Sequence, residues 1–269
     1  MELTGLDVRA FLAEDVGDGD VTAEAVVPAD ARLDATLLLM EAGVVCGLEV
    51  VEAVFRELDP DVAFELRAHD GDVVHGEVAR LSGDARALLA AERTALNLLG
   101  RLSGIATLTR SYVDAIEGTG PVILDTRKTT PGLRTLEKLA VRAGGGTNHR
   151  FGLFDAVLIK DNHLRLGGGV AETVRRAKET GLPVEVECET LDDVRAALDA
   201  RADTILLDNM TPAQLREAVA LVGGRARTEA SGGVRLDTVR EIAATGVDAI
   251  SVGALTHGAR SHDVSMEVR

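Results

Sequence analysis

The sequence of 269 residues contains no tryptophan and only one tyrosine, and aromatic residues make up 2% of the chain. Hydrophobic residues still account for 46%, so a core of ordinary size has to be built mainly from leucine, valine, isoleucine and alanine. No apolar run approaches the ~20 residues that a membrane-spanning helix requires. The N-terminal segment lacks the basic and apolar regions of a signal peptide, and we therefore expect a cytoplasmic protein.

Cysteine is also scarce. The two cysteines, Cys46 and Cys188, are too few for a disulfide framework and have no partner at a metal-ligand spacing, so we expect two reduced thiols. Acidic residues outnumber lysine and arginine by 44 to 29, which gives a formal net charge of −15. This balance argues against a nucleic-acid partner, because neutralising phosphates needs an exposed basic face. Adaptation to high salt and ordinary acidic solubility both remain open as its origin.

One stretch reverses this charge balance. Residues 127–160 carry seven cationic side chains against two anionic ones, a local charge of 7 − 2 = +5. A positive cluster in an anionic protein predicts a site for a small polyanion, in which arginine supplies a rigid fork and lysine a point charge. The cations are Arg127, Lys128, Arg134, Lys138, Arg142, Arg150 and Lys160, and the anions are Glu137 and Asp155.

Residues 1–104 predict a small α+β domain, in which strands and helices do not follow a repeated βαβ pattern. Thr4 is expected to cap a first helix over 6–16. The acidic segment 15–20 lacks the final glutamate of a calcium-binding loop, so a turn is the better interpretation. Strands are predicted over 32–40, 44–46, 62–66 and 73–81, and helices over 47–58 and 88–102.

From Pro121 onwards, short apolar runs alternate with helical segments. This alternation predicts a parallel sheet with right-handed crossovers, whose strands are buried on both faces. Six strands are too few for an eight-stranded TIM barrel, so a smaller or open barrel is expected. The strands are predicted over 122–124, 156–159, 184–186, 204–207, 226–228 and 249–252, and the helices over 135–143, 170–180, 191–200, 212–222 and 236–245.

The predicted fold class is therefore α/β: an N-terminal α+β layer domain followed by an incomplete parallel α/β barrel of about six strands. We place the first domain at residues 1–104 and the barrel at 105–259. The segment 263–268 alternates between apolar and polar residues. It is expected to return to the N-terminal domain as an added strand, so that the tail 260–269 joins that domain.

Polar residues follow the predicted barrel strands where each strand ends. In barrel enzymes these C-terminal ends form one mouth that holds the active site. Charges scattered through a core would be costly, whereas charges gathered at one mouth remain accessible to solvent and ligand. The alternative is a set of salt bridges on the rim. The residues are Thr126, Arg127 and Lys128 after the first strand, Lys160 after the second, Glu187 at the end of the third and Asp208 at the end of the fourth.

The last two strands are followed by glycines. Ser231, Gly232 and Gly233 follow the fifth strand and precede a predicted helix, and Gly253 follows the sixth. Backbone N–H groups at helix N-termini bind phosphate well, and barrels favour their last loops for this purpose. The two glycine sites together predict a phosphate cradle, which His257 is close enough to support. A plain turn and a surface histidine are the alternatives.

Seven motifs follow one another along the chain: DTRKTTPGLR, GGGTNHR, IKDNH, VEVE, LLDNM, EASGG and GVDAISVGALTH. In this order they resemble the quinolinate phosphoribosyltransferase family of type II phosphoribosyltransferases. EDVGDGDVT resembles the start of that family, and the resemblance runs from about Glu14 to His257. One such motif would be weak evidence, but seven in the right order are specific. The segment from Gly258 to His262 departs from the family pattern, which leaves the register of the tail open.

The resemblance implies an enzyme of de novo NAD biosynthesis. Its substrates would be quinolinate and 5-phosphoribosyl pyrophosphate, and its products nicotinate mononucleotide, pyrophosphate and CO2. Arginine and lysine suit the two carboxylates of quinolinate, His149 would donate a hydrogen bond to the same ligand, and Lys128 suits the pyrophosphate. The substrate-binding residues implied by the family are Arg93, Thr126, Arg127, Lys128, His149, Arg150, Lys160, Glu187, Asp208, Ser231, Gly232, Gly233, Gly253 and His257.

Catalysis is assigned by the resemblance to Lys160, Glu187 and Asp208. Glu187 and Asp208 would hold Mg2+ through oxygen ligands and stabilise the positive sugar carbon as pyrophosphate leaves. Attack by the ring nitrogen makes a pyridinium, which accepts the electrons released when the adjacent carboxylate departs as CO2. No nucleophilic side chain is needed, so catalysis is mostly positioning and charge placement.

Arg93 lies in ERTALNLL, a family pattern that is unaltered here. The resemblance implies a homodimer in which this arginine reaches into the partner subunit's site. Three other interpretations stay open at this point. One is a related enzyme with another acceptor, such as the molybdenum-transport-associated proteins. Another is an aldolase that forms a Schiff base on Lys160. The third is a non-catalytic nucleotide-binding protein, which would not need both Glu187 and Asp208.

Overall fold

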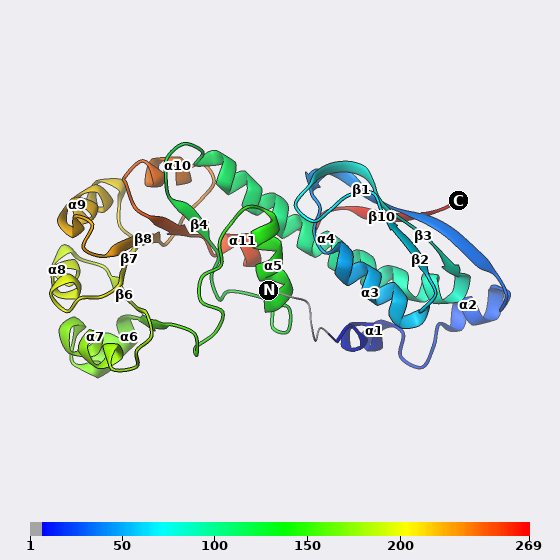
Figure 1. Cartoon of the computed structure of the whole chain (residues 1–269), viewed down its shortest axis with the longest axis horizontal. Helices are drawn as coiled ribbons and strands as arrows, with labels where there is room; N and C mark the ends of the chain where they lie inside the picture. The colour runs from blue at the N-terminus through cyan, green and yellow to red at the C-terminus, as the bar shows by residue number, and fades with distance from the viewer. Residues whose placement is uncertain (1–6) are drawn as a thin grey trace. The chain divides into compact units, whose positions relative to one another are not determined.

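The computed structural model describes residues 7–269, which form two compact units (Figure 1). The first unit consists of the described part of Met1–Arg110 with Gly132–Gly145 and Gly258–Arg269, and the second of Ser111–Pro131 and Gly146–His257. The sequence pattern places one boundary at residue 104 and assigns all of 105–259 to the barrel. In the structure, residues 132–145 group with the first unit.

The first unit is built around an antiparallel sheet of four strands in the order β10-β1-β3-β2. β1 covers the first predicted strand and extends to Val44, the first residue of the second. Its pairing with β3 continues through register shifts between Leu37 and Leu38 and between Leu39 and Gly43. β10 pairs with β1 and aligns Val268 with Ala35, so the prediction that the tail adds a strand to this layer is confirmed. The strands are β1 (Arg32–Val44), β2 (Ala63–Leu66), β3 (Val73–Asp84) and β10 (Val264–Val268).

Two aspartates cap helices of this unit. Asp20 accepts hydrogen bonds from the backbone N–H groups of Thr22 and Ala23, so the acidic segment ends in a helix cap, in keeping with the expected turn. Asp70 accepts hydrogen bonds from the backbone N–H groups of Gly47 and Leu48 at the start of α3. The predicted first helix corresponds to α1, and its expected cap Thr4 lies outside the described residues. The helices are α1 (Arg9–Asp15), α2 (Val21–Val26), α3 (Leu48–Leu58), α5 (Arg134–Ala143) and α4 (Ala85–Ala115), which continues into the second unit.

Two glycines of α4 allow the tail to lie against the helix. The backbone N–H of His262 donates to the carbonyl of Gly100 at 2.9 Å, and a Cβ at Gly100 would lie 2.7 Å from the carbonyl oxygen of His262. A Cβ at Gly104 would collide with the carbonyl oxygen of Arg260. Glycine is unfavourable inside a helix, so its presence here reflects the close approach of the two backbones.

The second unit contains a parallel sheet of six strands in the order β4-β9-β8-β7-β6-β5. β4 and β5 are edge strands that do not pair with each other, so the barrel is open between them. The helices lie outside the strands (Figure 1), and the predicted incomplete barrel is confirmed. The strands are β4 (Val122–Leu124), β5 (Val157–Ile159), β6 (Val184–Cys188), β7 (Thr204–Asp208), β8 (Arg227–Ser231) and β9 (Ala249–Ser251). The helices are α6 (Asp161–Gly167), α7 (Val170–Lys178), α8 (Leu191–Asp199), α9 (Pro212–Val222), α10 (Val239–Ala243) and α11 (Ala254–His257).

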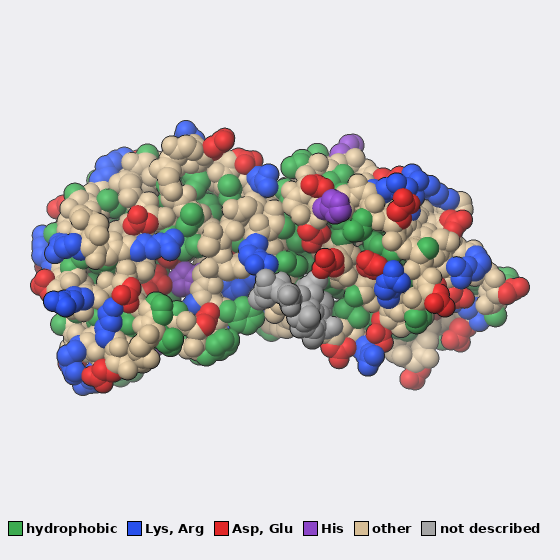
Figure 2. All heavy atoms as spheres, in the orientation of Figure 1, with side chains coloured by type: hydrophobic (Ala, Val, Ile, Leu, Met, Phe, Trp, Pro, Cys, Tyr) green, Lys and Arg blue, Asp and Glu red, His purple; other side chains and the backbone are tan. Residues whose placement is uncertain are grey.

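The surface mixes both signs of charge. Figure 2 shows acidic and basic side chains intermingled on the visible face, without a continuous basic patch there. Within residues 7–269, no helix combines the length and the apolar character needed to cross a membrane.

We predict that Gly104→Ala lowers the free energy of unfolding by about 1–3 kcal/mol, because the added methyl group meets the backbone of Arg260 and the tail has to move away. Denaturant unfolding checks this. The control is Asn97→Ala at an exposed position of the same helix, for which a change within about 0.5 kcal/mol is expected. A Gly104→Ala protein as stable as the wild type would contradict the proposed packing of the tail.

Candidate active site

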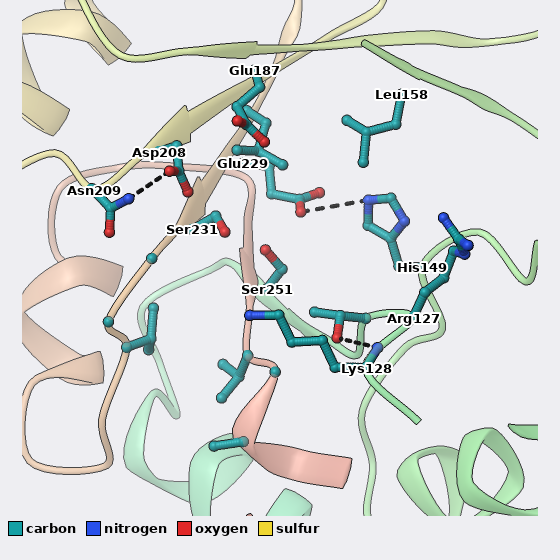
Figure 3. Close-up of a pocket in the computed structure, with 18 of the residues that line it drawn as sticks. Arg127, Lys128, His149, Leu158, Glu187, Asp208, Asn209, Glu229, Ser231 and Ser251 are labelled. Atoms are coloured by element: carbon teal, nitrogen blue, oxygen red, sulfur yellow. Dashed lines mark hydrogen bonds and ion pairs between the residues drawn. The ribbon is translucent and has the colours of Figure 1, made fainter. Parts of the chain in front are cut away.

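A pocket of about 920 Å³ opens in the second unit, at the C-terminal ends of the barrel strands (Figure 3). Arg93, by contrast, is exposed on α4 in the first unit and is not among the described residues that line the pocket. All the other expected substrate-binding residues line this pocket. They are Thr126, Arg127, Lys128, His149, Arg150, Lys160, Glu187, Asp208, Ser231, Gly232, Gly233, Gly253 and His257.

Glu187 and Asp208 come from neighbouring strands. Glu187 on β6 aligns with Leu206 on β7, two residues before Asp208. Lys160, which follows β5, places its Nζ 2.8 Å from Glu187 Oε2, and its side chain is 48% exposed. A lysine that forms a Schiff base has to be a neutral, desolvated amine. The paired and solvated ammonium of Lys160 therefore argues against the aldolase interpretation.

Asp125 fixes the segment that carries His149 and Arg150. Its carboxylate is fully buried at the end of β4 and accepts hydrogen bonds from Asn148 Nδ2 at 2.6 Å and from the backbone N–H of His149 at 2.8 Å. Thr147 adds a parallel bridge to Leu124. The glycine-rich segment before these residues is thus held alongside β4, and the next two side chains enter the pocket.

Two arginines of the pocket have unsatisfied donors. The Nε atoms of Arg127 and Arg150 are buried and have no hydrogen-bond partner among the described residues. Burial lowers the pKa of the Arg150 guanidinium from its ordinary value, and the positive charge of Arg127 lowers it further. Burying like charges together is unfavourable unless a counter-charge is supplied. The pair therefore provides planar donors for an anion.

The side chains of Lys128 and His257 both lie close to Gly253. A Cβ at Gly253 would come within 3.1 Å of Lys128 Cδ and 3.3 Å of His257 Nε2. Glycine at this position therefore avoids crowding these two side chains. The Thr256 hydroxyl donates to the carbonyl oxygen of Lys128 at 2.8 Å, which joins the loop after β4 to α11. The arrangement brings a lysine and a histidine to the loop of the last strand, where barrel enzymes bind phosphate.

The glycines after β8 form a loop rather than the first turn of a helix. α10 covers Val239–Ala243, so it lies within the helix predicted over 236–245 and is shorter at both ends. Gly232 has φ 92°, and a Cβ there would collide with the side chain of Asn209. Asn209 in turn donates from Nδ2 to Asp208 Oδ2 at 2.5 Å. A small residue at position 232 is therefore needed for the loop to approach β7 closely.

A buried acidic pair was not expected from the sequence. Glu185 and Glu229 lie on β6 and β8, and both face His149. The imidazole Nε2 lies 2.9 Å from Glu185 Oε2. It lies 3.6 Å from Glu229 Oε1, the contact drawn as a dashed line in Figure 3. Burial, and after it the negative charge of Glu185, raises the pKa of Glu229 to about 7.

The same three side chains have ligand atoms within 4.8 Å of one another, a separation that would suit a metal ion. The backbone N–H of Arg150 donates to His149 Nδ1 at 2.8 Å, however, so Nδ1 carries a lone pair and the ring proton is on Nε2. A nitrogen that holds a proton does not bind a metal. Both ring nitrogens of His149 have partners within the protein, and the expected hydrogen bond from His149 to the ligand stays a prediction.

A signal for the acidic pair was present in the strand pattern. Glu185 precedes Glu187 by two residues, and Glu229 precedes Ser231 by two. Since side chains alternate along a strand, each acid shares a face with a residue expected in the site. An acid within an otherwise apolar run should therefore have been assigned to the barrel interior. Other pocket residues that the sequence pattern did not single out are Leu158, Asn209, Arg235 and Ser251.

Comparison with known proteins identifies relatives along the whole chain. Residues 20–103 match the model of the N-terminal domain of quinolinate phosphoribosyl transferase, and residues 105–267 match that of its C-terminal domain. A probable carboxylating nicotinate-nucleotide pyrophosphorylase of Bacillus subtilis (strain 168) is 44% identical over 263 residues, covering 96% of this chain and 91% of the relative. A chloroplastic carboxylating nicotinate-nucleotide pyrophosphorylase of Oryza sativa subsp. japonica is 43% identical over 285 residues, covering 97% of this chain and 76% of the relative.

Solved structures agree with these matches. NadC from Streptococcus pyogenes has a TM-score of 0.94 at 40% identity, covering 99% of this chain and 97% of that chain. The nicotinate-nucleotide pyrophosphorylase from Francisella tularensis has a TM-score of 0.94 at 41% identity, covering 97% of this chain and 94% of that chain. From the ordered motifs, the open barrel and these relatives, we conclude that the chain belongs to the quinolinate phosphoribosyltransferase family.

Proposed function

We propose that this protein transfers the phosphoribosyl group of 5-phosphoribosyl pyrophosphate to the ring nitrogen of quinolinate, and that nicotinate mononucleotide, pyrophosphate and CO2 are released. Beyond family membership, one observation carries the proposal. Arg127 and Arg150 present buried Nε donors without a protein partner in the same pocket. Quinolinate is a planar dianion, and guanidinium groups match carboxylates in both charge and geometry.

The quinolinate site lies where these two arginines and Lys160 meet the pocket. A bound dianion offsets the mutual repulsion of the arginines and satisfies their donors. Lys160 is already paired with Glu187, so it supplies a flexible point charge that can move to a carboxylate of the ligand. Together the three cations orient the ring nitrogen toward the sugar.

The phosphoribosyl donor occupies the opposite side of the pocket. Lys128 suits the pyrophosphate, and the glycine-rich loops at Gly232 and Gly253, with His257 beside them, suit the 5-phosphate. Gly253 leaves room for both side chains, so an amine and an imidazole can face the same anionic donor.

Glu187 and Asp208 fit a Mg2+ site. Both offer hard carboxylate oxygens at one mouth, and each is held by a neighbour, Glu187 by Lys160 and Asp208 by Asn209. When bound, Mg2+ supplies positive charge that neutralises the leaving pyrophosphate. The two carboxylates face the position where the sugar carbon becomes positive, and they stabilise that charge.

The first test is turnover. We expect nicotinate mononucleotide to form from quinolinate and 5-phosphoribosyl pyrophosphate with Mg2+, and not when nicotinate replaces quinolinate or when a chelator is in excess. Glu187→Gln and Asp208→Asn are expected to lower kcat about 100-fold or more. Glu189→Gln, at an exposed position beyond the same strand end, is the matched control and should keep wild-type activity. Full activity with excess chelator would disprove the metal requirement.

The second test concerns substrate assignment. Arg127→Ala is expected to raise KM for quinolinate by about 10- to 100-fold, the loss of one charge-assisted contact, and to change KM for 5-phosphoribosyl pyrophosphate much less. Lys160→Ala, which is expected to be inactive, should show the same selectivity in equilibrium binding of the two substrates. Steady-state kinetics measure both constants, and Arg195→Ala, on the exposed surface of α8, is the control. Equal losses for the two substrates would refute this assignment of Arg127.

We further propose a homodimer in which Arg93 reaches the pocket of the partner subunit. Arg93 is exposed in the first unit and belongs to the family pattern ERTALNLL. We expect Arg93→Ala and Lys160→Ala to be inactive alone. After subunit exchange, half of the dimers are mixed and each has one intact site, so about a quarter of wild-type activity should return, in keeping with twofold symmetry. No recovery after proven exchange would rule out a shared site.

A further inference from the structure

The proposed reaction needs a proton that neither substrate supplies at the right place. When the C2 carboxylate of the pyridinium leaves as CO2, the carbon–carbon bond breaks and its electron pair stays on C2. The positive ring nitrogen next to it stabilises this pair. A C2–H bond then has to form, so one proton is consumed at C2 in each turnover. The inference below rests on the proposed function and asks which group gives that proton.

Glu229 is a buried carboxyl group that lines the substrate pocket. Its residue is 3% exposed, and its Oε1 is buried without a hydrogen-bond partner among the described residues. In Figure 3 its carboxyl group points toward the ring of His149, beside the labelled Ser251. A carboxyl group in this setting is less costly when it is protonated than when it is charged.

We propose that the carboxyl group of Glu229 is the catalytic acid that donates its proton to C2 as CO2 departs. The O–H bond of Glu229 breaks, the electron pair on C2 takes the proton, and Glu229 becomes a carboxylate. After product leaves, water entering through the open mouth of the pocket restores the proton. No oxidant, reductant or further reactant is required.

The surroundings of Glu229 favour a protonated carboxyl group that is still able to give up its proton. Burial and the charge of Glu185 favour the neutral form and bring the pKa to about 7, while His149, the Ser251 hydroxyl and Arg227 act in the opposite direction. An acid with a pKa near neutrality combines a useful protonated fraction with a useful driving force for transfer. Paired acids with different environments recur in enzymes that need one proton donor.

Neighbouring groups are less suited to this role. The Nε2 proton of His149 faces Glu185 at 2.9 Å, and its Nδ1 is an acceptor for the backbone of Arg150. The Nζ of Lys160 donates to Glu187 at 2.8 Å, and in the proposed function this cation holds a carboxylate of quinolinate. His149 and Glu185 are positioning residues here, since they fix the orientation and charge state of Glu229.

The proton donor can be identified from the isotope that reaches C2. The wild type, Glu229→Gln and Glu229→Asp turn over quinolinate in an equal mixture of H2O and D2O, and mass spectrometry gives the ratio of hydrogen to deuterium at C2 of nicotinate mononucleotide. A carboxyl group and a water molecule discriminate between hydrogen and deuterium to different extents, so the ratio at C2 depends on which of them is the donor. We expect Glu229→Gln to change the ratio and lower kcat about 100-fold with little change in KM. Glu229→Asp, which keeps the acid, should retain the wild-type ratio, as should the control Glu189→Gln.

Each result decides the question. A wild-type ratio in folded Glu229→Gln overturns the proposal, whatever the change in kcat, because the donor is then unchanged. If Glu229→Gln also fails to release pyrophosphate, its defect lies in the phosphoribosyl transfer that precedes decarboxylation. This result too contradicts the proposal. If Glu229→Gln does not fold, Glu229→Met removes the acid at similar volume without an unpaired polar group and is read in the same way. Absence of turnover by the wild type would instead overturn the proposed function itself.

Discussion

The buried carboxylate of Asp125 is the anchor on which the pocket depends. It lies at the end of β4, an edge strand of the open barrel, and binds the side chain of Asn148 and the backbone of His149. The bridge between Thr147 and Leu124 holds the same segment beside the strand, two residues before His149. A charged acceptor of two short hydrogen bonds is stronger than a neutral one, which suits a position with little other support.

The pocket that results contains charges of both signs at close range. Arg127 and Arg150 repel each other, as do Glu185 and Glu229, and His149 lies between the two groups. Such an arrangement is unfavourable in the free protein, and an anionic ligand beside the arginines would offset their repulsion. In the proposed function, ligand binding would return part of the free energy that the fold gives up in bringing these like charges together.

Much of this could be predicted from the sequence, and the failures have physical causes. The six strands and the polar residues that end them were predictable, because buried parallel strands are short apolar runs and their C-terminal ends meet. Glu185 was missed because its neighbours on the strand are apolar and only the two-residue period reveals its face. The grouping of α5 with the first unit depends on contacts distant in sequence, such as Arg101 with the buried Glu137, which no local pattern contains. The length of α10 was overestimated, because the helical period of the sequence extends into flanking residues that form turns.

The pairing of β10 with β1 also has a consequence for biosynthesis. β10 follows the entire second unit in the sequence, yet it completes the sheet of the first unit as an edge strand. During translation the ribosome must release the whole barrel before that sheet can close, so the edge of β1 stays uncovered while the barrel folds. Exposed strand edges invite pairing with other chains. The edge of β1 is therefore open to pairing with other chains from the time it is synthesised until the last strand arrives.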